Sequence, residues 1–437
     1  MALDRVKNNR WLPLLKSGSY LLPRWPHKIR SGSLVGATKN RVGPMLERRP
    51  TPPSAIPLQK IISSLPRLFP RSIEQSCCDY RDFKADPNDL QAQLLSSLPF
   101  FPVANDGKTA KIVKTPVDDQ GNYINEFTVY PTHPNSSTPM KHLILVHGYG
   151  AGLGFFLKNL EKLKLGKNDW TVHAIDLPGY GFSSRCKFPF RFARDPAELV
   201  EQWFHSRFRS WMETKGLLKT PQNNMVVAHS MGAYLTALYA NKFPYDFRKL
   251  VMCSPAGICS SDPMLRKSHP PWWFQKLWDR NISPFSLVRN AFIFGSMLTS
   301  GWSYRRFGSL LGSKSSTGAR QFEALHRYAY AIFNRPGSGE YLLPFALKCG
   351  GDPRVALEER LFNFEDHFKA KCDWLWLYGD NDWIDATGGE RVSKLLGEWK
   401  GPKSAFNLIK DAGHHLYFDN YEQFNSILER EMAKWDS

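Results

Sequence analysis

Cysteine is scarce in this sequence, and its arrangement excludes two classes of site. The seven cysteines are odd in number and irregularly spaced, so they form neither a disulfide framework nor the paired spacing of a zinc site. They are Cys77, Cys78, Cys186, Cys253, Cys259, Cys349 and Cys372. We therefore expect a reducing compartment, in which these cysteines serve as small core residues.

Long apolar runs are also missing. A run of about 18 or more apolar residues, the length that a membrane-spanning helix needs, is absent. The N-terminus likewise lacks the apolar core of about 7–15 residues that marks a secretory signal. The sequence contains no internal repeat and no recognisable nucleic-acid-binding motif.

Acidic residues are nearly absent from residues 1–50, where 11 Lys and Arg stand against Asp4 and Glu47. This composition, rich in Arg and Ser and poor in acids, predicts a mitochondrial transit peptide; a disordered basic tail is the alternative. The segment carries half of the net charge of +18, and the other half is spread over the rest of the chain. A spread positive charge favours nucleic acid or anionic lipid as a partner, and the missing nucleic-acid motif leaves lipid.

The expected partner is therefore an anionic phospholipid membrane surface, with no nucleic acid, and the expected location is peripheral on the mitochondrial inner membrane. A basic surface that serves only solubility is the alternative. The amino-acid sequence gives no indication of the oligomeric state.

The chain divides into four parts. We interpret residues 1–85 as presequence and linker, and we expect a short helix within 86–104. Residues 86–258 and 369–437 would form the two parts of one α/β core, and 259–368 a helical cap. Buried strands are predicted at 143–146, 171–175, 225–227, 250–253, 374–378 and 405–409, with an antiparallel pair near 110–131. Short apolar runs separated by helix-length segments indicate a mostly parallel sheet covered by helices on both faces.

The expected cap is dense in aromatic residues interleaved with Lys and Arg, as in 272–280 and 302–307. It is too long to be a plain connection, so it should have structure of its own. Aromatic residues beside cations suit a phospholipid headgroup region. A well-packed helical subdomain without membrane contact is the alternative.

A candidate nucleophile lies where a predicted strand runs into a helix, in Ala228-His229-Ser230-Met231-Gly232. This is the setting in which a small-x-Ser-x-Gly motif holds a serine on a strained turn, although Ala228 stands where glycine is usual. The loop His147-Gly148-Tyr149-Gly150 follows the strand at 143–146. We assign the oxyanion hole to the N–H groups of Tyr149 and Met231, and a structural role to His147.

An acid and a base follow Ser230 along the chain. The order Ser, acid, His is the one that this kind of site has in the chain. Gly413-His414-His415 follows the last strand; we choose His414 as the base, with His415 as the lesser candidate. The loop 379–385 offers three carboxylates. We choose Asp382 as the acid, ahead of Asp385 and then Asp380, and expect the other two to cap the loop or lie on the surface.

Together these motifs resemble the α/β-hydrolase superfamily over about 140–435, supported by Asp176-Leu177-Pro178-Gly179-Tyr180-Gly181. A narrower resemblance is to its lipid-acting branch, which contains lysophospholipases, a lipase coactivator, fungal lysophosphatidic acid acyltransferases and the fungal mitochondrial cardiolipin-specific deacylase. It is carried by 283–286, 304–307, 378–385 and the spacing His414-x4-Asp419. With the presequence, it favours the cardiolipin deacylase group.

The resemblance implies a serine-dependent phospholipid deacylase, with cardiolipin the favoured substrate and no metal or organic cofactor. Lysophospholipid acyl transfer is the first alternative, and a non-catalytic lipid-surface adaptor is the second. That branch uses the His-x4-Asp spacing as an acyltransferase motif. Asp419, followed by Glu422 and a helix-like stretch, instead predicts a capping box, in which Asp419 is the N-cap.

Overall fold

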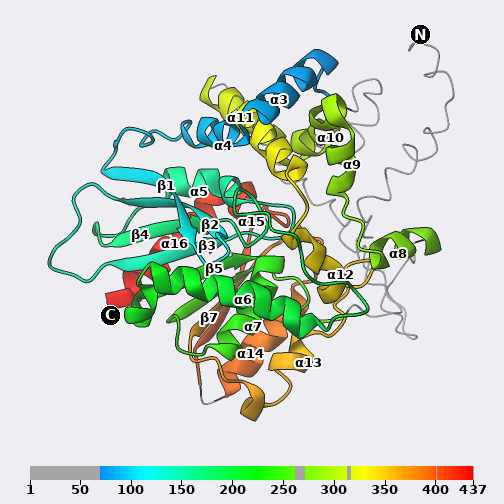
Figure 1. Ribbon diagram of the computed structural model, residues 1–437. Coiled ribbons are helices and arrows are strands. Elements are labelled where there is room, and N and C mark those ends of the chain that lie inside the picture. The colour runs from blue at the N-terminus through cyan, green and yellow to red at the C-terminus, as the bar shows by residue number, and fades with distance from the viewer. Residues whose placement is uncertain (1–68, 261–270, 313–315, 400, 437) are drawn as a thin grey trace, which may run out of the picture.

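The computed structural model describes residues 69–260, 271–312, 316–399 and 401–436. Their centre is one eight-stranded sheet in the order β1-β2-β4-β3-β5-β6-β7-β8 (Figure 1). The strands are β1 (Lys108–Pro116), β2 (Tyr123–Pro131), β3 (Lys141–Val146), β4 (Trp170–Ile175), β5 (Asn224–His229), β6 (Lys249–Cys253), β7 (Asp373–Gly379) and β8 (Ser404–Ile409). β3 to β8 are parallel, and only β1 and β2 run antiparallel to their neighbours. All six predicted parallel strands and the antiparallel edge pair are confirmed.

The sequences of the central strands are continuous apolar runs because helices cover both faces of the sheet. In β3, Leu143 and Leu145 enter one buried cluster, whereas Ile144 and Val146 enter the other. The helices around the sheet are α4 (Pro87–Leu95), α5 (Leu157–Lys162), α6 (Ala197–Thr214), α7 (Met231–Lys242), α14 (Thr387–Glu398), α15 (Leu416–Asp419) and α16 (Tyr421–Ala433). α6, α7 and α14 supply the second cluster, and α4, α5 and α16 supply the first. The predicted fold class, an α/β architecture with helices on both faces of the sheet, is confirmed.

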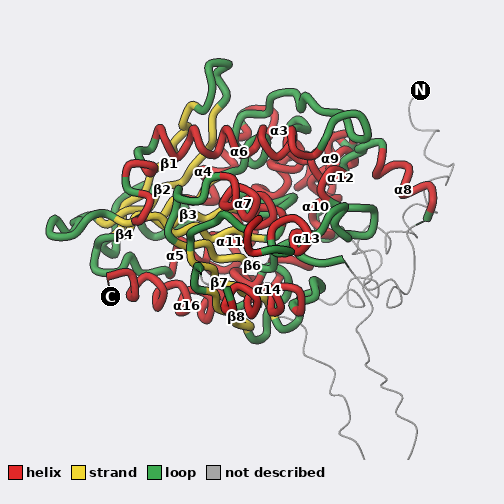
Figure 2. The backbone as a smooth tube through the Cα atoms, turned by 90° about the horizontal axis from the view of Figure 1, so that it is seen from below, coloured by secondary structure: helices red, strands yellow, loops and turns green. Residues whose placement is uncertain are grey.

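The cap follows β6 and ends before β7, inside the segment 259–368. Its helices are α8 (Trp272–Asp279), α9 (Phe285–Asn290), α10 (Gly295–Phe307), α11 (Ser316–Asn334), α12 (Leu343–Ala346) and α13 (Leu357–Leu361). α10 and α11 pack on each other, and α8 projects from the body in both whole-molecule views (Figures 1 and 2). The expected helical cap insert is confirmed.

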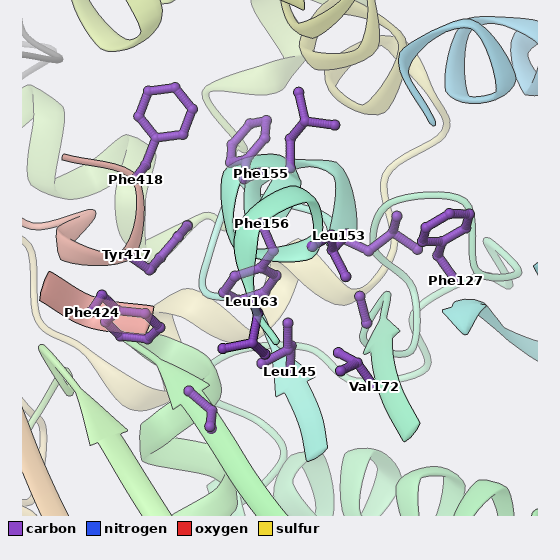
Figure 3. Close-up of a cluster of buried hydrophobic side chains, with 14 of the residues drawn as sticks. Phe127, Leu145, Leu153, Phe155, Phe156, Leu163, Val172, Tyr417, Phe418 and Phe424 are labelled. Atoms are coloured by element: carbon purple, nitrogen blue, oxygen red, sulfur yellow. The ribbon is translucent and has the colours of Figure 1, made fainter. Parts of the chain in front are cut away.

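The cap and the core share one buried cluster. Phe155 contacts the rings of Trp302 and Phe307 from α10 and of Tyr328 from α11. The Phe418 ring lies edge-on to Phe307 from the other side. Figure 3 shows the core side of this cluster, in which Phe155 and Phe156 lie beside Tyr417 and Phe418 and above Leu145 and Val172 of the sheet. The cap is therefore fixed to the core directly above the ends of the strands.

The N-terminal part of the described chain also belongs to the folded body. Residues 73–85, grouped above with the presequence and linker, form helix α3 (Ile73–Ala85), which packs on α10. The contact is polar: Asp79 is buried and receives two hydrogen bonds from Arg71, one from Ser296 and one from Arg327. Burial by itself raises the pKa of Asp79, but hydrogen bonds from His326, Arg71 and Ser296, together with the charge of Arg71, hold this pKa well below its usual value.

The short helix expected within 86–104 is α4. The expected transit peptide at residues 1–50 lies outside the described residues. Within the described ranges, none of the helices has the length and apolar character needed to cross a bilayer.

Candidate active site

Ser230 lies on a strained turn between β5 and α7. Its backbone has φ 53° and ψ −118°, a region that a residue with a side chain rarely adopts. A Cβ on Gly232 would lie 2.2 Å from the carbonyl oxygen of His147, so only glycine permits this approach of α7 to the loop after β3. Ala228 is fully buried on the strand side of the turn. The turn directs the Ser230 hydroxyl away from the sheet, at the carboxyl ends of the parallel strands.

A chain of hydrogen bonds joins the three residues expected to form a triad. The Ser230 Oγ donates to His414 Nε2 at 2.9 Å. The opposite ring nitrogen, Nδ1, donates to Asp382 Oδ1 at 3.1 Å. Because the carboxylate can only accept, Nδ1 carries the proton and Nε2 offers its lone pair to the serine. This arrangement can take a proton from Ser230 and stabilise the resulting imidazolium.

The two rival carboxylates have other partners. Asp385 accepts from the backbone N–H of Thr387 at the start of α14. Asp380 accepts from the backbone N–H of Ala412 and so ties its loop to the loop that carries His414. The Asp382 carboxylate also accepts from the N–H of Ile384, and its side chain is almost fully buried. The structure therefore brings Asp382, rather than a rival, to the histidine.

The loop after β3 lies directly against the serine. A Cβ on Gly148 would be 2.9 Å from the Ser230 Cβ, so the loop backbone lies this close to Ser230 only because residue 148 is glycine. Met231 is the first residue of α7, and the first N–H groups of a helix have no partner within it. The residues chosen for the oxyanion hole, Tyr149 and Met231, thus lie on the two backbone segments that flank Ser230.

His147 holds this loop in place. Its Nε2 accepts from the N–H of Leu177, so Nδ1 carries the proton and donates to the carbonyl of Gly148. Full burial lowers the pKa of His147, and it remains neutral. Both ring nitrogens are occupied by backbone groups, as the structural role proposed for this residue requires.

Two further histidines surround His414 and support it. His229 Nε2 donates to the carbonyl of His414 at 2.8 Å. The His415 ring packs on the rings of His229 and Tyr417 instead of turning to Ser230. Burial lowers the pKa values of His229 and His415 well below the usual histidine value, and nearby cationic groups add to the effect. The structure thus places His414, and not the lesser candidate His415, on the serine.

The prediction that Asp419 caps the last long helix is wrong. The N-cap of α16 is Asn420, whose side chain accepts from the N–H of Gln423. Asp419 is the last residue of α15, and its carboxylate forms an ion pair of 2.8 Å with Arg306 of the cap. Its other oxygen accepts from the N–H of Gly413, the residue before His414, at 2.8 Å. Asp419 therefore links the cap to the histidine loop.

Arg306 is the residue of this region that sequence reasoning did not assign to the site. It also donates to the carbonyl of His415, so it contacts the histidine loop directly as well as through Asp419. The only signal for it was its place in Tyr304-Arg305-Arg306-Phe307, which by itself does not show a partner more than 100 residues away.

Aromatic side chains form the surroundings of the site. Phe285 of α9 stacks on Tyr149 with ring centroids 5.6 Å apart, and the Trp383 ring lies 4.9 Å from that of His414. Gly150 adopts a positive φ, and a Cβ there would meet Phe285 at 2.8 Å. Within the described part of the chain, no group of three or more side chains is arranged to hold a metal ion.

The chain is similar to several known proteins. The model of a family described as alpha/beta hydrolase fold matches residues 141–421. A probable 1-acylglycerol-3-phosphate O-acyltransferase of Oryza sativa subsp. japonica is 30% identical over 71% of this chain and 70% of its own length. A human (lyso)-N-acylphosphatidylethanolamine lipase is 28% identical over 70% of this chain and 82% of its own length. Among solved structures, a thermophilic esterase of Thermogutta terrifontis is 17% identical over 75% of this chain and all of its own, with a TM-score of 0.48.

Proposed function

The chain belongs to the alpha/beta hydrolase fold family, and from that premise we propose that it is a serine-dependent phospholipid deacylase. The observation that carries the proposal is the hydrogen-bonded series Ser230–His414–Asp382 at the carboxyl ends of the parallel strands. The names of its relatives, an acylglycerol-phosphate acyltransferase and a lipase of N-acylphosphatidylethanolamines, support a glycerophospholipid as the substrate.

In the proposed reaction, Ser230 Oγ attacks a fatty-acyl ester carbonyl while His414 Nε2 takes the hydroxyl proton. Asp382 holds the imidazole in its tautomer and stabilises the imidazolium. The N–H groups of Tyr149 and Met231 stabilise the negative oxygen of the tetrahedral intermediate. His414 then gives its proton to the departing lysophospholipid alkoxide, which leaves an acyl-enzyme. Water, deprotonated by His414, attacks that ester and releases the fatty acid and free Ser230.

Replacement of the serine tests this function. Ser230→Ala should lower ester turnover by about a million-fold, because losing one triad member disables the whole unit. Labelling by a fluorophosphonate probe should disappear with it, while the melting temperature stays unchanged. Ser206→Ala, an exposed serine on α6, is the matched control and should keep both activity and labelling. Residual turnover above roughly a hundredth of the wild-type value, or no labelling of the wild-type protein, would contradict the proposal; the second result favours a non-catalytic adaptor.

For the substrate we propose cardiolipin, and for the location the mitochondrial inner membrane, with the protein bound peripherally. The basic, acid-poor segment 1–50 and the net charge of +18 support both, since cardiolipin is anionic. Lipid profiles of mitochondria from cells without the protein should show an excess of fully acylated cardiolipin and a deficit of its monolyso form. If the amount of cardiolipin were unchanged and another phospholipid accumulated, cardiolipin would be the wrong substrate and that other lipid the right one.

Acyl transfer to a lysophospholipid is the second candidate, favoured by the relative named as an acyltransferase. It would use the same acyl-enzyme with an alcohol in place of water. Asp419 does not support it, because its carboxylate is engaged by Arg306 and Gly413. Product analysis with and without acyl-CoA distinguishes the two functions: a deacylase releases fatty acid in both cases, whereas a transferase forms new phospholipid only with acyl-CoA and a lysophospholipid acceptor.

A further inference from the structure

One stretch of the cap, residues 272–294, exposes several large apolar side chains. They are Trp272, Trp273 and Leu277 of α8, Ile282 in the next loop, Leu287 of α9, and those of the turn 292–294. Trp272 is 70% exposed and Phe292 is 62% exposed. Single exposed apolar residues are normal on a protein surface, but a group of them on neighbouring elements marks an interaction site. We refer to this group as the cap face.

Helix α8 has two distinct sides. Trp278 faces the body, where its indole N–H donates to the carbonyl of Leu347. The opposite side carries Trp272 with Lys276 one turn on, and the Lys276 ammonium lies 4.9 Å from the centre of the Trp272 ring. Arg280 follows one further turn along. A helix with tryptophan and aliphatic side chains beside a row of cations is the pattern of a helix that lies in a membrane interface.

The charge on the cap face is of one sign. Between residues 271 and 312 the chain has five Lys and Arg and a single acid, Asp279. Asp279 forms an ion pair with Arg354, so the one negative charge of this stretch is compensated. Arg289 and Arg306 are held by Glu340 and Asp419 inside the protein. Arg305 is only partly exposed, so the exposed cations of the cap face are Lys276 on α8 and Arg280 at the C-cap of that helix.

Helix α9 connects the cap face with the surroundings of the candidate active site. Leu287 of α9 is exposed on the cap face, whereas Phe285, two residues earlier, stacks on Tyr149 beside Ser230. In Figures 1 and 2, α8 and α9 lie at the same end of the molecule. A surface that receives the cap face would therefore lie next to the serine, within reach of an acyl chain drawn from it.

We propose that the cap face docks on an anionic phospholipid bilayer, with its apolar side chains among the upper acyl chains and Lys276 and Arg280 at the headgroups. An anionic bilayer fits both features of the surface, apolar groups and cations. A second copy of the chain fits less well, because pairing two such faces would bring like charges together. The inference rests on the proposed function only for what happens to the lipid after docking.

Vesicle binding tests the proposal in the Ser230→Ala background, where the lipid stays intact. The full-length chain is sedimented with phosphatidylcholine vesicles, with and without phosphatidylglycerol. Changing Trp272, Leu287 and Phe292 to serine should weaken binding to the mixed vesicles by at least roughly tenfold, since each change removes an apolar side chain that the bilayer would bury. Lys276→Glu with Arg280→Glu should remove the preference for phosphatidylglycerol, because each cation near an anionic surface contributes about fivefold in affinity.

Two controls separate docking from folding and from catalysis. Tyr245→Ser and Phe364→Ser remove side chains that are exposed to a similar degree but lie outside the cap face, and should leave binding unchanged. With Ser230 restored, the cap-face variants should hydrolyse a water-soluble p-nitrophenyl ester at the wild-type rate but lose activity on vesicles.

Unchanged vesicle binding in the cap-face variants would overturn the proposal. So would an equal loss of soluble-ester turnover and of vesicle activity, which would show a role in folding. A wild-type dimer that the cap-face variants convert to a monomer would assign the surface to a second copy. If the Ser230 protein binds anionic vesicles through the cap face but releases no fatty acid, the docking surface stands and the proposed function fails.

Discussion

At the scale of single residues, the site depends on which carboxylate reaches His414. Asp382 is almost completely buried and contacts Nδ1 through both oxygens, at 3.1 and 3.4 Å. An amide in its place can still face the ring, but it can present its NH2 group and select the tautomer that has no lone pair at Nε2.

Asp382→Asn should therefore lower ester turnover by about 10⁴-fold with little change in stability. Asp385→Asn is the matched control: Asn still caps Thr387 through its carbonyl oxygen, so turnover should remain near the wild-type value. Steady-state kinetics on a soluble ester measure both. The assignment of the acid would be exchanged if the Asp385 variant lost activity and the Asp382 variant kept it.

The sequence predicts the residues that meet at the site because each has a local signature. Ser230 lies between a strand and a helix, Asp382 follows the glycine that ends β7, and His414 follows β8. Asp419 shows where local signals fail. Asn and Asp serve almost equally as N-caps, so the sequence does not distinguish a helix that starts after Asn420 from one that starts after Asp419. The partner that decides the question, Arg306, belongs to a distant part of the chain.

At the scale of elements, the buried pair Arg306–Asp419 connects α10 of the cap with α15 beside the histidine loop. The two side chains are only 11% and 2% exposed. Breaking a buried ion pair by neutralising one partner leaves an uncompensated charge, and this costs about 3–5 kcal/mol. Neutralising both partners leaves no such charge.

Asp419→Asn should thus destabilise the protein by roughly 3 kcal/mol and lower ester turnover through the loosened loop before His414. Arg306→Met combined with Asp419→Asn should recover much of the stability and part of the turnover. Urea unfolding and soluble-ester kinetics test the pair. Glu358→Gln breaks the exposed pair with Arg391 and should cost less than about 1 kcal/mol. Additive losses in the double variant would refute this link.

Helix α3 illustrates what hydrophobic periodicity does not reveal. Its buried residues are Ser76 and Asp79, so no apolar stripe marks the side that packs on the cap. The helix is joined to the cap through Arg71, which reaches both Asp79 and Glu323. A contact of this kind becomes visible only when both partners are placed in space. The strands of the sheet were predictable for the opposite reason, because burial on both faces requires continuous apolar runs.

At the scale of the whole molecule, buried neutral histidines make stability depend on pH. Burial lowers the pKa of His142 to about 3 and of His205 to about 4, and it also lowers the pKa values of four others. The four are His147, His229, His326 and His415. An unfolded chain takes up protons at these residues below a pH of about 6.5, whereas the folded chain does not.

The unfolded state therefore binds more protons in acid, and the free energy of unfolding falls as pH drops from about 6.5 toward the folded-state values. Each histidine lowers the free energy of unfolding by at most roughly 1.4 kcal/mol per pH unit. Melting temperatures should be constant between pH 7 and 8 and fall steeply between about pH 6 and 4. His205→Gln keeps a side chain that can donate to the carbonyl of Leu235, and it should flatten the slope. A flat profile in the wild-type protein would contradict this account.

The N-terminal segment 1–50 is proposed to determine the location of the whole protein in the cell. Residues 1–50 fused to a fluorescent reporter should direct it to mitochondria, since the segment is basic and almost free of acids. A second fusion, with its Lys and Arg changed to Gln, should stay in the cytosol and serves as the control. A wild-type fusion that remains cytosolic would refute the targeting proposal and leave a basic tail.

Because the cap is inserted between β6 and β7, the parts of the candidate site are synthesised at different times. A polypeptide leaves the ribosome, or crosses a translocation pore, with its amino end first. Strands β1 to β6 and Ser230 then arrive before the cap, while Asp382, His414 and Asp419 arrive only after it. Throughout that interval the nascent or half-imported chain holds a serine that has neither its base nor its acid. If the proposed roles hold, such a chain cannot deacylate the membrane that it is passing, and activity begins only when the last loop closes over a finished cap.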